Sequence, residues 1–458
     1  MLVNFVKGQT VDATAARLAV SMILDTLGVM VAGSAEPGVK VLAAALEPAP
    51  GGVPSLWAGH AYRAEDSALL MGMASHVLDY DDVSMLAVCH PSAPVLSALL
   101  NAAPWREVAG ADFIDAFVIG TEVLIRLGQA MGFGHYALGF HATATLGSVG
   151  AAAACARLLK LNAVEVRNAL AIAASLSSGL RKNFGSMVKS LHVGIAAANG
   201  LKAARLAAAG IEGAPEVLEG RGFFFAFSGG ETDTWPQGLA LGEPFAIVDP
   251  GFEQKRYPCC YLLHKMIEGT LALKRHGSLG LDDVASVRVD VPQGGTSALI
   301  HPYPKTGLNA LFSGPYAVAA CLEDGRIDLK SFTDEAVLRP EIQVRLRDVA
   351  LVEASAVARS GSDVGGGAVT VTLQPRRGPA ISQSVTASPG SPEDPLTVNQ
   401  ARSKWLDCVQ HARPGIDPVL AMALFEDGPR LADAQAIDDW FGRVSAALRG
   451  GGKEMMPS

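Results

Sequence analysis

Aspartate, histidine and lysine residues cluster in a few short stretches of this sequence, in combinations that suit acid–base chemistry on an anionic substrate. The first stretch, VLDYDDVSMLAVCHPSAP (residues 77–94), holds Asp79, Asp81 and Asp82 within four positions. Its apolar neighbours predict a partly buried segment, and burial raises a carboxyl pKa so that the group can carry protons. Asp82 is instead expected to lie in a solvated loop.

Two histidines stand at expected helix starts. His90 precedes the prolines of PSAP and an apolar run, and proline is favoured in the first helical turn. His141, within GFHATAT, precedes a long alanine-rich helix. The dipole at such a position disfavours an imidazolium and favours a bound anion. A harmless cap or a structural histidine is the alternative at each position, but two such histidines in one domain favour a functional role.

The stretch RKNFGSMVKSLHVG (residues 181–194) concentrates positive charge in a largely apolar part of the chain. Lys189 and His192 are three residues apart and share one face of a helix. Met187, Val188 and Leu191 are expected to desolvate Lys189, which lowers a lysine pKa towards values useful for acid–base chemistry. The alternative is a lysine whose charged end extends into solvent.

A third basic stretch, KRYPCC (residues 255–260), leads into a further expected helix. Lys255 is predicted either to reach over a cleft or to belong to an exposed basic turn. The six cysteines show no CxxC spacing, so they indicate a reduced, cytoplasmic protein rather than a zinc or disulfide scaffold. Cys259 and Cys260 are expected to be small buried residues.

Composition limits the classes of partner. The chain has 458 residues, 49% of them hydrophobic, and a formal charge of −8, without any basic run of the kind that binds nucleic acid. Residues 127–156 lack Asp, Glu, Lys and Arg, but six glycines and two histidines interrupt them, which favours a buried helix pair over a membrane span. The start of the chain does not have the pattern of a signal peptide.

The positioning elements are predicted from periodicity. Alanine and leucine recur at helical spacing up to about residue 245 and again over residues 398–449, whereas residues 284–291 and 368–373 alternate with a strand period. Residues 380–387 are expected to pair with 368–373 as a hairpin, and helices are expected over about 308–322 and 335–348. We therefore predict a mainly α fold: a large all-helical domain from residues 1–250 and 390–458, with a smaller α+β lid domain, 251–389, inserted. A cleft between them would bind the substrate.

Taken together, the stretches LDYDD, HPSAPVL, GFHATATLGSVGAAAA, NFGSMVKSLHVG, KRYPCC and LEDGRIDLKSFTDEAV resemble the MmgE/PrpD family, which includes 2-methylcitrate dehydratase, cis-aconitate decarboxylase and iminodisuccinate epimerase. The resemblance covers nearly the whole chain. It implies a homodimer that uses neither a metal nor an organic cofactor. The family's functional positions fall on residues quoted above: Asp79, His90, His141, Lys189 with His192, and Lys255.

The resemblance also shows where the chain departs from its decarboxylase-like members. Those members tend to have threonine after DYDD, where this chain has Val83, and Tyr-Val-Asn-Arg-Pro where this chain reads ALIHP, residues 298–302. The missing tyrosine and arginine argue against decarboxylation of cis-aconitate and leave His301 as a candidate substrate-binding residue. Arg181 and Asn183 belong to an Arg-x-Asn-Phe-Gly pattern found in another branch of the family.

These residues predict a hydro-lyase acting on a small di- or tricarboxylate. Lys189, Lys255 and Arg181 would hold carboxylates, and this pairing acidifies the neighbouring C–H bond. His90, Asp79 or neutral Lys189 would remove the proton, and a histidine would protonate the departing hydroxyl. The alternatives are an epimerase of an amino- or imino-dicarboxylate, a decarboxylase, a metal-dependent hydratase and a catalytically dead binding protein.

Overall fold

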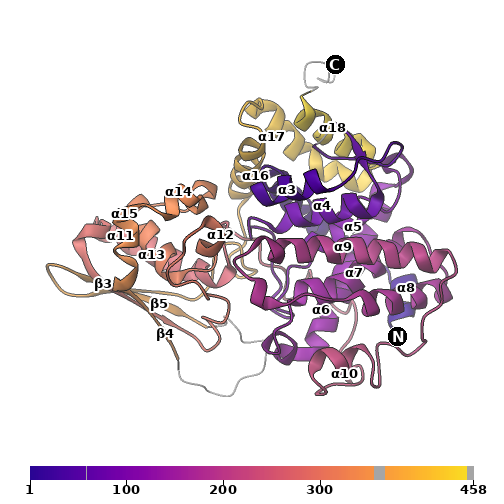
Figure 1. The fold of residues 1–458 in the computed structure, drawn as a ribbon, viewed down its shortest axis with the longest axis horizontal. Coiled ribbons are helices and arrows are strands. Elements are labelled where there is room, and N and C mark those ends of the chain that lie inside the picture. The colour runs from indigo at the N-terminus through magenta and orange to yellow at the C-terminus, as the bar shows by residue number, and fades with distance from the viewer. Residues whose placement is uncertain (58, 355–366, 451–458) are drawn as a thin grey trace.

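The computed structural model describes residues 1–57, 59–354 and 367–450, and these are mainly helical (Figure 1). The prediction of a mainly α protein is confirmed, and the predicted lid arrangement and domain boundaries stay predictions. In its described residues the N-terminal half forms ten α-helices and one two-stranded ribbon, β1 Val53–Pro54 and β2 Ala61–Tyr62. The helices are α1 Leu2–Gly8, α2 Ala13–Gly33, α3 Pro37–Ala45, α4 Ala64–His76, α5 Ser92–Leu99, α6 Gly110–Ala137, α7 Ala142–Leu158, α8 Ala163–Leu176, α9 Met187–Ala208 and α10 Phe223–Ser228.

The middle of the chain contains a four-stranded sheet with helices. The sheet order is β4-β3-β5-β6, with β3 parallel to β4 and antiparallel to β5. The predicted hairpin is confirmed, because β5 pairs with β6 in antiparallel register. The strands are β3 Val284–Val291, β4 Val349–Glu353, β5 Val369–Pro375 and β6 Ile381–Val385. The helices are α11 His264–Gly277, α12 Gly307–Ala310, α13 Gly314–Asp324, α14 Asp334–Val337 and α15 Pro340–Gln343.

Two helices expected in this region are shorter than predicted. The segment predicted over 308–322 is divided between α12 and α13, because Ser313 caps α13 and Pro315 occupies its first turn. The segment predicted over 335–348 is divided into α14, α15 and a final 3-10 turn, with Pro340 at the start of α15. A proline inside the expected helix cannot donate the backbone hydrogen bond that continuation needs.

The last part of the chain returns to the helical body. It forms α16 Val398–Ala412, α17 Pro418–Asp427 and α18 Asp438–Arg449, and α16 packs on α2. Figure 1 shows the sheet and α11–α15 to one side, and α16–α18 against the helices of the N-terminal half. One hydrophobic core draws on residues 2–252 and 405–447, and a second on residues 257–373 with Tyr136 and Phe184. These two aromatic residues carry the second core to the end of α6 and the start of α9.

Small residues bring α4 and α9 unusually close together. A Cβ placed on Gly72 would lie 2.7 Å from the Cα of Gly194, so neither position has room for a side chain. The alanines of α7 are likewise buried among α5, α6, α8 and α9. Since Lys189 lies on α9 and His76 ends α4, this close packing lets the two side chains meet.

Two helices in the described part of the chain, α2 and α6, are long and apolar enough to cross a membrane. Their most apolar stretches are 72% and 83% buried inside the protein. Burial of this extent is expected for core helices, which bury their apolar surface against neighbouring helices. The helix pair predicted around residues 127–156 is observed as the end of α6 and most of α7.

Candidate active site

Asp79 lies at the centre of a buried cluster of charges, in the loop between α4 and α5. Its Oδ1 is 2.6 Å from the Nζ of Lys255 and 3.3 Å from the Nζ of Lys189. Lys255 also donates to the carbonyl oxygen of Asp79 at 2.6 Å. Asp79 has a φ of 48°, a left-handed conformation that is strained for a residue with a side chain. The contacts to Lys255 on both its carbonyl and its carboxylate hold it there.

The prediction of a raised Asp79 pKa is wrong. Burial acts to raise it, but Lys189 and Lys255 outweigh burial and hold the pKa well below its ordinary value. A carboxylate this acidic is a poor base. Its role is to fix two ammonium groups. Lys255 stays charged, because Asp79 more than offsets the effect of burial and raises its pKa.

His76 is part of this cluster, although no prediction included it. Its Nδ1 lies 2.8 Å from Asp81 Oδ2, and its Nε2 lies 2.7 Å from Lys189 Nζ. Asp81 is ionised, because His76 and His90 outweigh its burial and hold its pKa well below the ordinary value. An ionised Asp81 accepts a hydrogen bond from the Nδ1–H group of His76. The unprotonated Nε2 of His76 can then accept a hydrogen bond from Lys189. Burial lowers the pKa of His76 to about 3.

The prediction that Asp82 is solvated is wrong as well. The residue is fully buried and accepts hydrogen bonds from the backbone N–H and the hydroxyl of Ser92, the first residue of α5. Burial raises the Asp82 pKa to about 8, with smaller contributions from Asp81 and Asp25. Asp82 therefore ties the aspartate loop to the helix that follows His90, and it is the carboxyl of this loop whose pKa is raised.

His90 precedes α5 as predicted. Its backbone N–H donates to Thr143 Oγ1 at 3.0 Å, its Nδ1 lies 3.4 Å from Asp81 Oδ2, and its Nε2 lies 3.7 Å from Asp79 Oδ1. Burial lowers the pKa of His90, so the ring is neutral near pH 7. A neutral imidazole beside an ionised Asp81 is a competent base.

His141 is the N-cap residue of α7, again as predicted. Its Nδ1 lies 3.3 Å from His192 Nδ1. Its Nε2 is buried and has no hydrogen-bond partner among the described residues. Burial, with Lys189 nearby, holds the pKa of His141 well below its ordinary value. A buried nitrogen without a protein partner is the kind of group that a substrate can satisfy.

Lys189 is buried as predicted, but by different neighbours. Met187 and Val188 are exposed, whereas Lys189 is only 5% exposed and its Nζ lies 5.2 Å from the ring centres of Phe184 and of Phe312. Burial lowers its pKa, and Asp79 only partly offsets this effect. Two lysines bound to one carboxylate thus differ, because Lys255 is held charged while Lys189 releases its proton more readily.

Lys404 is the second residue that sequence reasoning missed. It lies on α16, about 3% exposed, and donates to Asp25 Oδ2 at 2.9 Å and to the carbonyl oxygens of Tyr80 at 2.9 Å and Lys255 at 3.0 Å. Its Nζ also lies 4.1 Å from the ring centre of Tyr80. Lys404 therefore fixes the backbone beside Asp79 and at Lys255 together.

A cavity of about 60 Å³ opens where the two hydrophobic cores meet. Because one water molecule needs about 10–15 Å³, the cavity has room for a small organic acid. Most polar lining groups come from residues 79–189 of the chain: Asp79, His90, Tyr136, His141, Thr143 and Lys189. Residues 260–312 contribute Cys260, Tyr261, Leu262, Ser297, Ala298 and Phe312.

Four predicted catalytic residues therefore line one cavity. Lys255 is fully buried behind Asp79, so both predictions for it, a residue that reaches over the cleft and an exposed basic turn, are wrong. The four predicted substrate-binding residues lie outside the lining. The guanidinium of Arg181 stacks on Tyr136, 4.2 Å from its ring centre. His301 Nε2 lies 3.3 Å from the carbonyl oxygen of Phe184. The remaining two are Asn183, which is half-buried in the 3-10 turn Arg181–Asn183, and His192 against His141.

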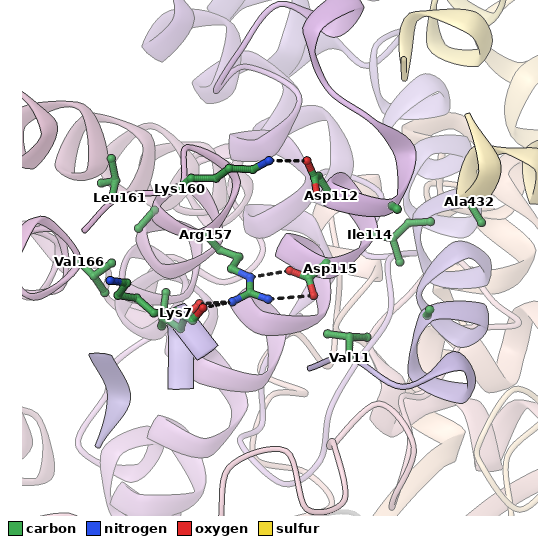
Figure 2. Close-up of a pocket in the computed structure, with 14 residues that line it drawn as sticks. Lys7, Val11, Asp112, Ile114, Asp115, Arg157, Lys160, Leu161, Val166 and Ala432 are labelled. Atoms are coloured by element: carbon green, nitrogen blue, oxygen red, sulfur yellow. Dashed lines mark hydrogen bonds and ion pairs between the residues drawn. The ribbon is translucent and has the colours of Figure 1, made fainter. Parts of the chain in front are cut away.

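A larger cavity, of about 600 Å³, lies apart from this cluster, beside α1, α6 and α7 (Figure 2). Arg157 crosses it, pairs with Asp115 at 2.6 Å and donates to carbonyl oxygens at the end of α1. Lys160 pairs with Asp112 at 3.0 Å. Its lining has no histidine or cysteine, so it lacks the imidazole bases of the smaller cavity.

The charge cluster also has the composition of a metal site, since His76, Asp79, Asp81 and His90 offer ligand atoms within 4.8 Å of one another. The lysines argue against one. The Nζ of Lys189 is hydrogen-bonded to His76 Nε2, and Lys189 and Lys255 both pair with Oδ1 of Asp79. A cation there would meet two ammonium groups at close range. These residues therefore do not fit a metal ion.

Comparison with known proteins places this geometry in a family. Residues 2–236 match the MmgE/PrpD N-terminal domain, and residues 257–415 match the MmgE/PrpD C-terminal domain. Cis-aconitate decarboxylase of Homo sapiens is 29% identical over 72% of this chain and 70% of its own length. A cis-aconitate decarboxylase-like protein of Aspergillus oryzae is 27% identical over 75% of each chain, and cis-aconitate decarboxylase of Aspergillus terreus is 28% identical over 70% of this chain and 68% of its own. The chain belongs to the MmgE/PrpD family.

Proposed function

We propose that this protein is a cofactor-independent lyase that removes a proton beside a carboxylate of a small di- or tricarboxylate and expels a hydroxyl group as water. The observation that carries the proposal is the convergence of Lys189, His90 and His141 on one small cavity. An ammonium group, a neutral base and a buried nitrogen without a protein partner are the three groups that such an elimination needs.

Lys189 pairs with the carboxylate beside the reacting carbon and stabilises the enolate charge that develops there. His90 takes the proton from that carbon. The electron pair of the broken C–H bond forms the new double bond as the C–O bond breaks. The departing hydroxyl accepts a hydrogen bond from His141 and leaves as water with the proton that His90 took. Each positioned acid or base contributes about 10²–10⁴ in rate.

Asp79 and Lys255 support this chemistry. Asp79 holds Lys189 at the cavity wall, and Lys255 neutralises the carboxylate that would otherwise repel an anionic substrate. His76 accepts a hydrogen bond from Lys189 and so fixes the direction of its Nζ. All of these contacts are buried, so their electrostatic effect on the substrate is little screened by water.

Decarboxylation is the second candidate, and the names of the relatives favour it. In that reaction the bond to a departing CO₂ breaks, the remaining electron pair is held beside the carboxylate on Lys189, and His90 in its protonated form delivers a proton to carbon. Against it stands the segment 298–302, which lacks the tyrosine and arginine expected of decarboxylase-like members and presents Ala298 to the cavity.

The test is product analysis with hydroxylated and unsaturated di- and tricarboxylic acids. Proton NMR follows alkene formation and a CO₂ electrode follows decarboxylation, with the His90→Gln variant as the matched inactive control. We expect an alkene and water from at least one hydroxy acid, at a rate at least 100-fold above that of the variant. Release of CO₂ without dehydration would move the assignment to the decarboxylase, and inversion at carbon alone would move it to the epimerase. If no acid is converted, the proposed lyase activity is rejected.

A further inference from the structure

The charges on the cavity wall are unevenly distributed. Among the residues that line it, Lys189 is the only lysine or arginine and Asp79 is the only aspartate or glutamate, and the two form an ion pair. His90 and His141 add no charge, because burial lowers the pKa of each ring. The part of the wall formed by residues 260–312 has no charged side chain among its lining residues: Cys260, Tyr261, Leu262, Ser297, Ala298 and Phe312.

A second cation stands beside the cavity. The guanidinium of Arg181 lies over Tyr136, a lining residue, and no carboxylate of the described residues forms an ion pair with it. The side chains of Arg181 and Tyr136 also share a hydrogen bond, and the remaining N–H groups of a guanidinium can bind a carboxylate with two parallel hydrogen bonds. Arg181 is therefore placed to hold an anionic group that extends past Tyr136.

We propose that the substrate is a dicarboxylate with an uncharged, apolar third arm, held by Lys189 and Arg181 and packed through that arm against Leu262, Ala298 and Phe312. This inference rests on the proposed function and narrows its substrate class. The arm is an alkyl or alkenyl substituent of a few carbons, in keeping with the small cavity.

The same geometry disfavours a tricarboxylate. Its third carboxylate would lie against residues 260–312 of the wall, where the hydroxyl of Ser297 is an available donor but no cation is present to offset the loss of water. Loss of one charge-assisted hydrogen bond corresponds to about tenfold to a hundredfold in affinity. We therefore expect tricarboxylates to bind at least tenfold more weakly than dicarboxylates with an alkyl arm.

The experiment measures binding and turnover separately, with the full-length protein. Isothermal titration calorimetry ranks malate, 2-methylmalate, 3-methylmalate and 3-isopropylmalate against citrate and isocitrate, and alkene absorbance follows conversion of the same acids. An alkyl-substituted malate should bind at least tenfold more tightly than malate and than either tricarboxylate. Tighter binding of citrate or isocitrate, or no binding of any alkyl-substituted acid, overturns the inference.

These readouts distinguish the two proposals. If the alkyl-substituted acids bind best but none is converted, the substrate class stands and the lyase activity fails. If citrate or isocitrate is bound and dehydrated best, the lyase activity stands and the substrate class fails.

Two variants of one loop test the role of the uncharged wall. Ala298→Arg adds a cation to the wall and should raise the ratio of tricarboxylate to dicarboxylate affinity at least tenfold. Ile300→Arg adds the same charge two residues away, at a side chain that is 46% exposed and outside the lining, and should leave that ratio unchanged. An equal shift in both variants, or none in Ala298→Arg, would contradict the proposed contact.

Arg181 is tested in the same assay. Arg181→Gln should lower the affinity for alkyl-substituted malates about tenfold to a hundredfold, because one carboxylate of the ligand loses its counter-ion. Lys182→Gln removes a neighbouring exposed cation and should leave affinity within about twofold, as expected for an exposed charge. Unchanged affinity in Arg181→Gln would remove the second carboxylate from the inferred substrate.

Discussion

At the scale of single residues, two lysines pair with one carboxylate but differ in their position relative to the cavity. Asp79 binds the Nζ atoms of both Lys189 and Lys255, yet Lys189 faces the cavity and Lys255 is enclosed behind it. His76 strengthens the difference, because its Nε2 accepts a hydrogen bond from Lys189 alone. The electrostatic arrangement therefore depends on His76 being neutral in the folded protein.

The protonation of His76 gives a stability prediction. Its pKa is about 3 in the folded protein against 6.5 ordinarily, so unfolding adds a proton between these values. This contribution to stability is complete above pH 6.5 and is lost as pH falls towards 3. Between pH 7.5 and 5.5 the loss of this contribution lowers the free energy of unfolding by about 1.4 kcal/mol.

Urea unfolding of the wild type and of His76→Gln at pH 7.5 and 5.5 checks this expectation. The variant should be less stable at pH 7.5 but should lose about 1.4 kcal/mol less than the wild type on acidification. His276→Gln, which removes an exposed histidine, is the control for the general effect of losing an imidazole. Parallel losses in the wild type and His76→Gln would show that His76 does not gain a proton on unfolding.

At the scale of elements, helix α16 supports the geometry of a site to which it contributes no lining residue. Lys404 reaches from α16 to Asp25 on α2 and to the two backbone carbonyls beside the charge cluster. Such a contact cannot be read from sequence, because it joins residues separated by 149 to 379 positions. A single lysine in an amphipathic helix gives no signal that it is buried.

Removing Lys404 should damage both stability and catalysis. Lys404→Met leaves Asp25 buried without its cation, which costs about 3–5 kcal/mol of unfolding free energy. Lys404→Met with Asp25→Asn removes both charges and should recover a large part of that loss. The measurements are urea unfolding and, for the folded fraction, kcat. Lys202→Met, at an exposed position of α9, should leave the free energy of unfolding and kcat unchanged within error.

For Lys404, a positioning role and a purely structural role predict different results. If Lys404 positions the backbone of Asp79 and Lys255, the stabilised double variant still shows a lower kcat, at least tenfold. A double variant with wild-type kcat would mean that Lys404 serves folding alone.

At the scale of the whole molecule, the sequence supports the architecture better than the site. Hydrophobic periodicity located the helices and the β5–β6 hairpin, because those patterns follow from local geometry. Four of the five catalytic candidates line one cavity, and the sequence indicated them because they lie in short polar stretches of an apolar chain. Asp79 and Asp82 were misjudged, since a carboxyl pKa depends on which cations the fold brings near it, and Lys189 and Lys255 lie 110 and 176 residues from Asp79. The homodimer and the cytoplasmic location stay predictions.

The most direct test of the central claim, that Lys189 stabilises an enolate formed in this cavity, is deuterium exchange followed by NMR in D₂O. Hydroxylated and unsaturated di- and tricarboxylic acids are incubated with the wild type, with Lys189→Met and with Lys202→Met as the matched surface control. The account predicts that the wild type and the control place deuterium on the carbon beside a carboxylate of at least one acid, while Lys189→Met does so about 10²–10⁴ times more slowly. Exchange by Lys189→Met at the wild-type rate, or no exchange by the wild type with any acid, would contradict it.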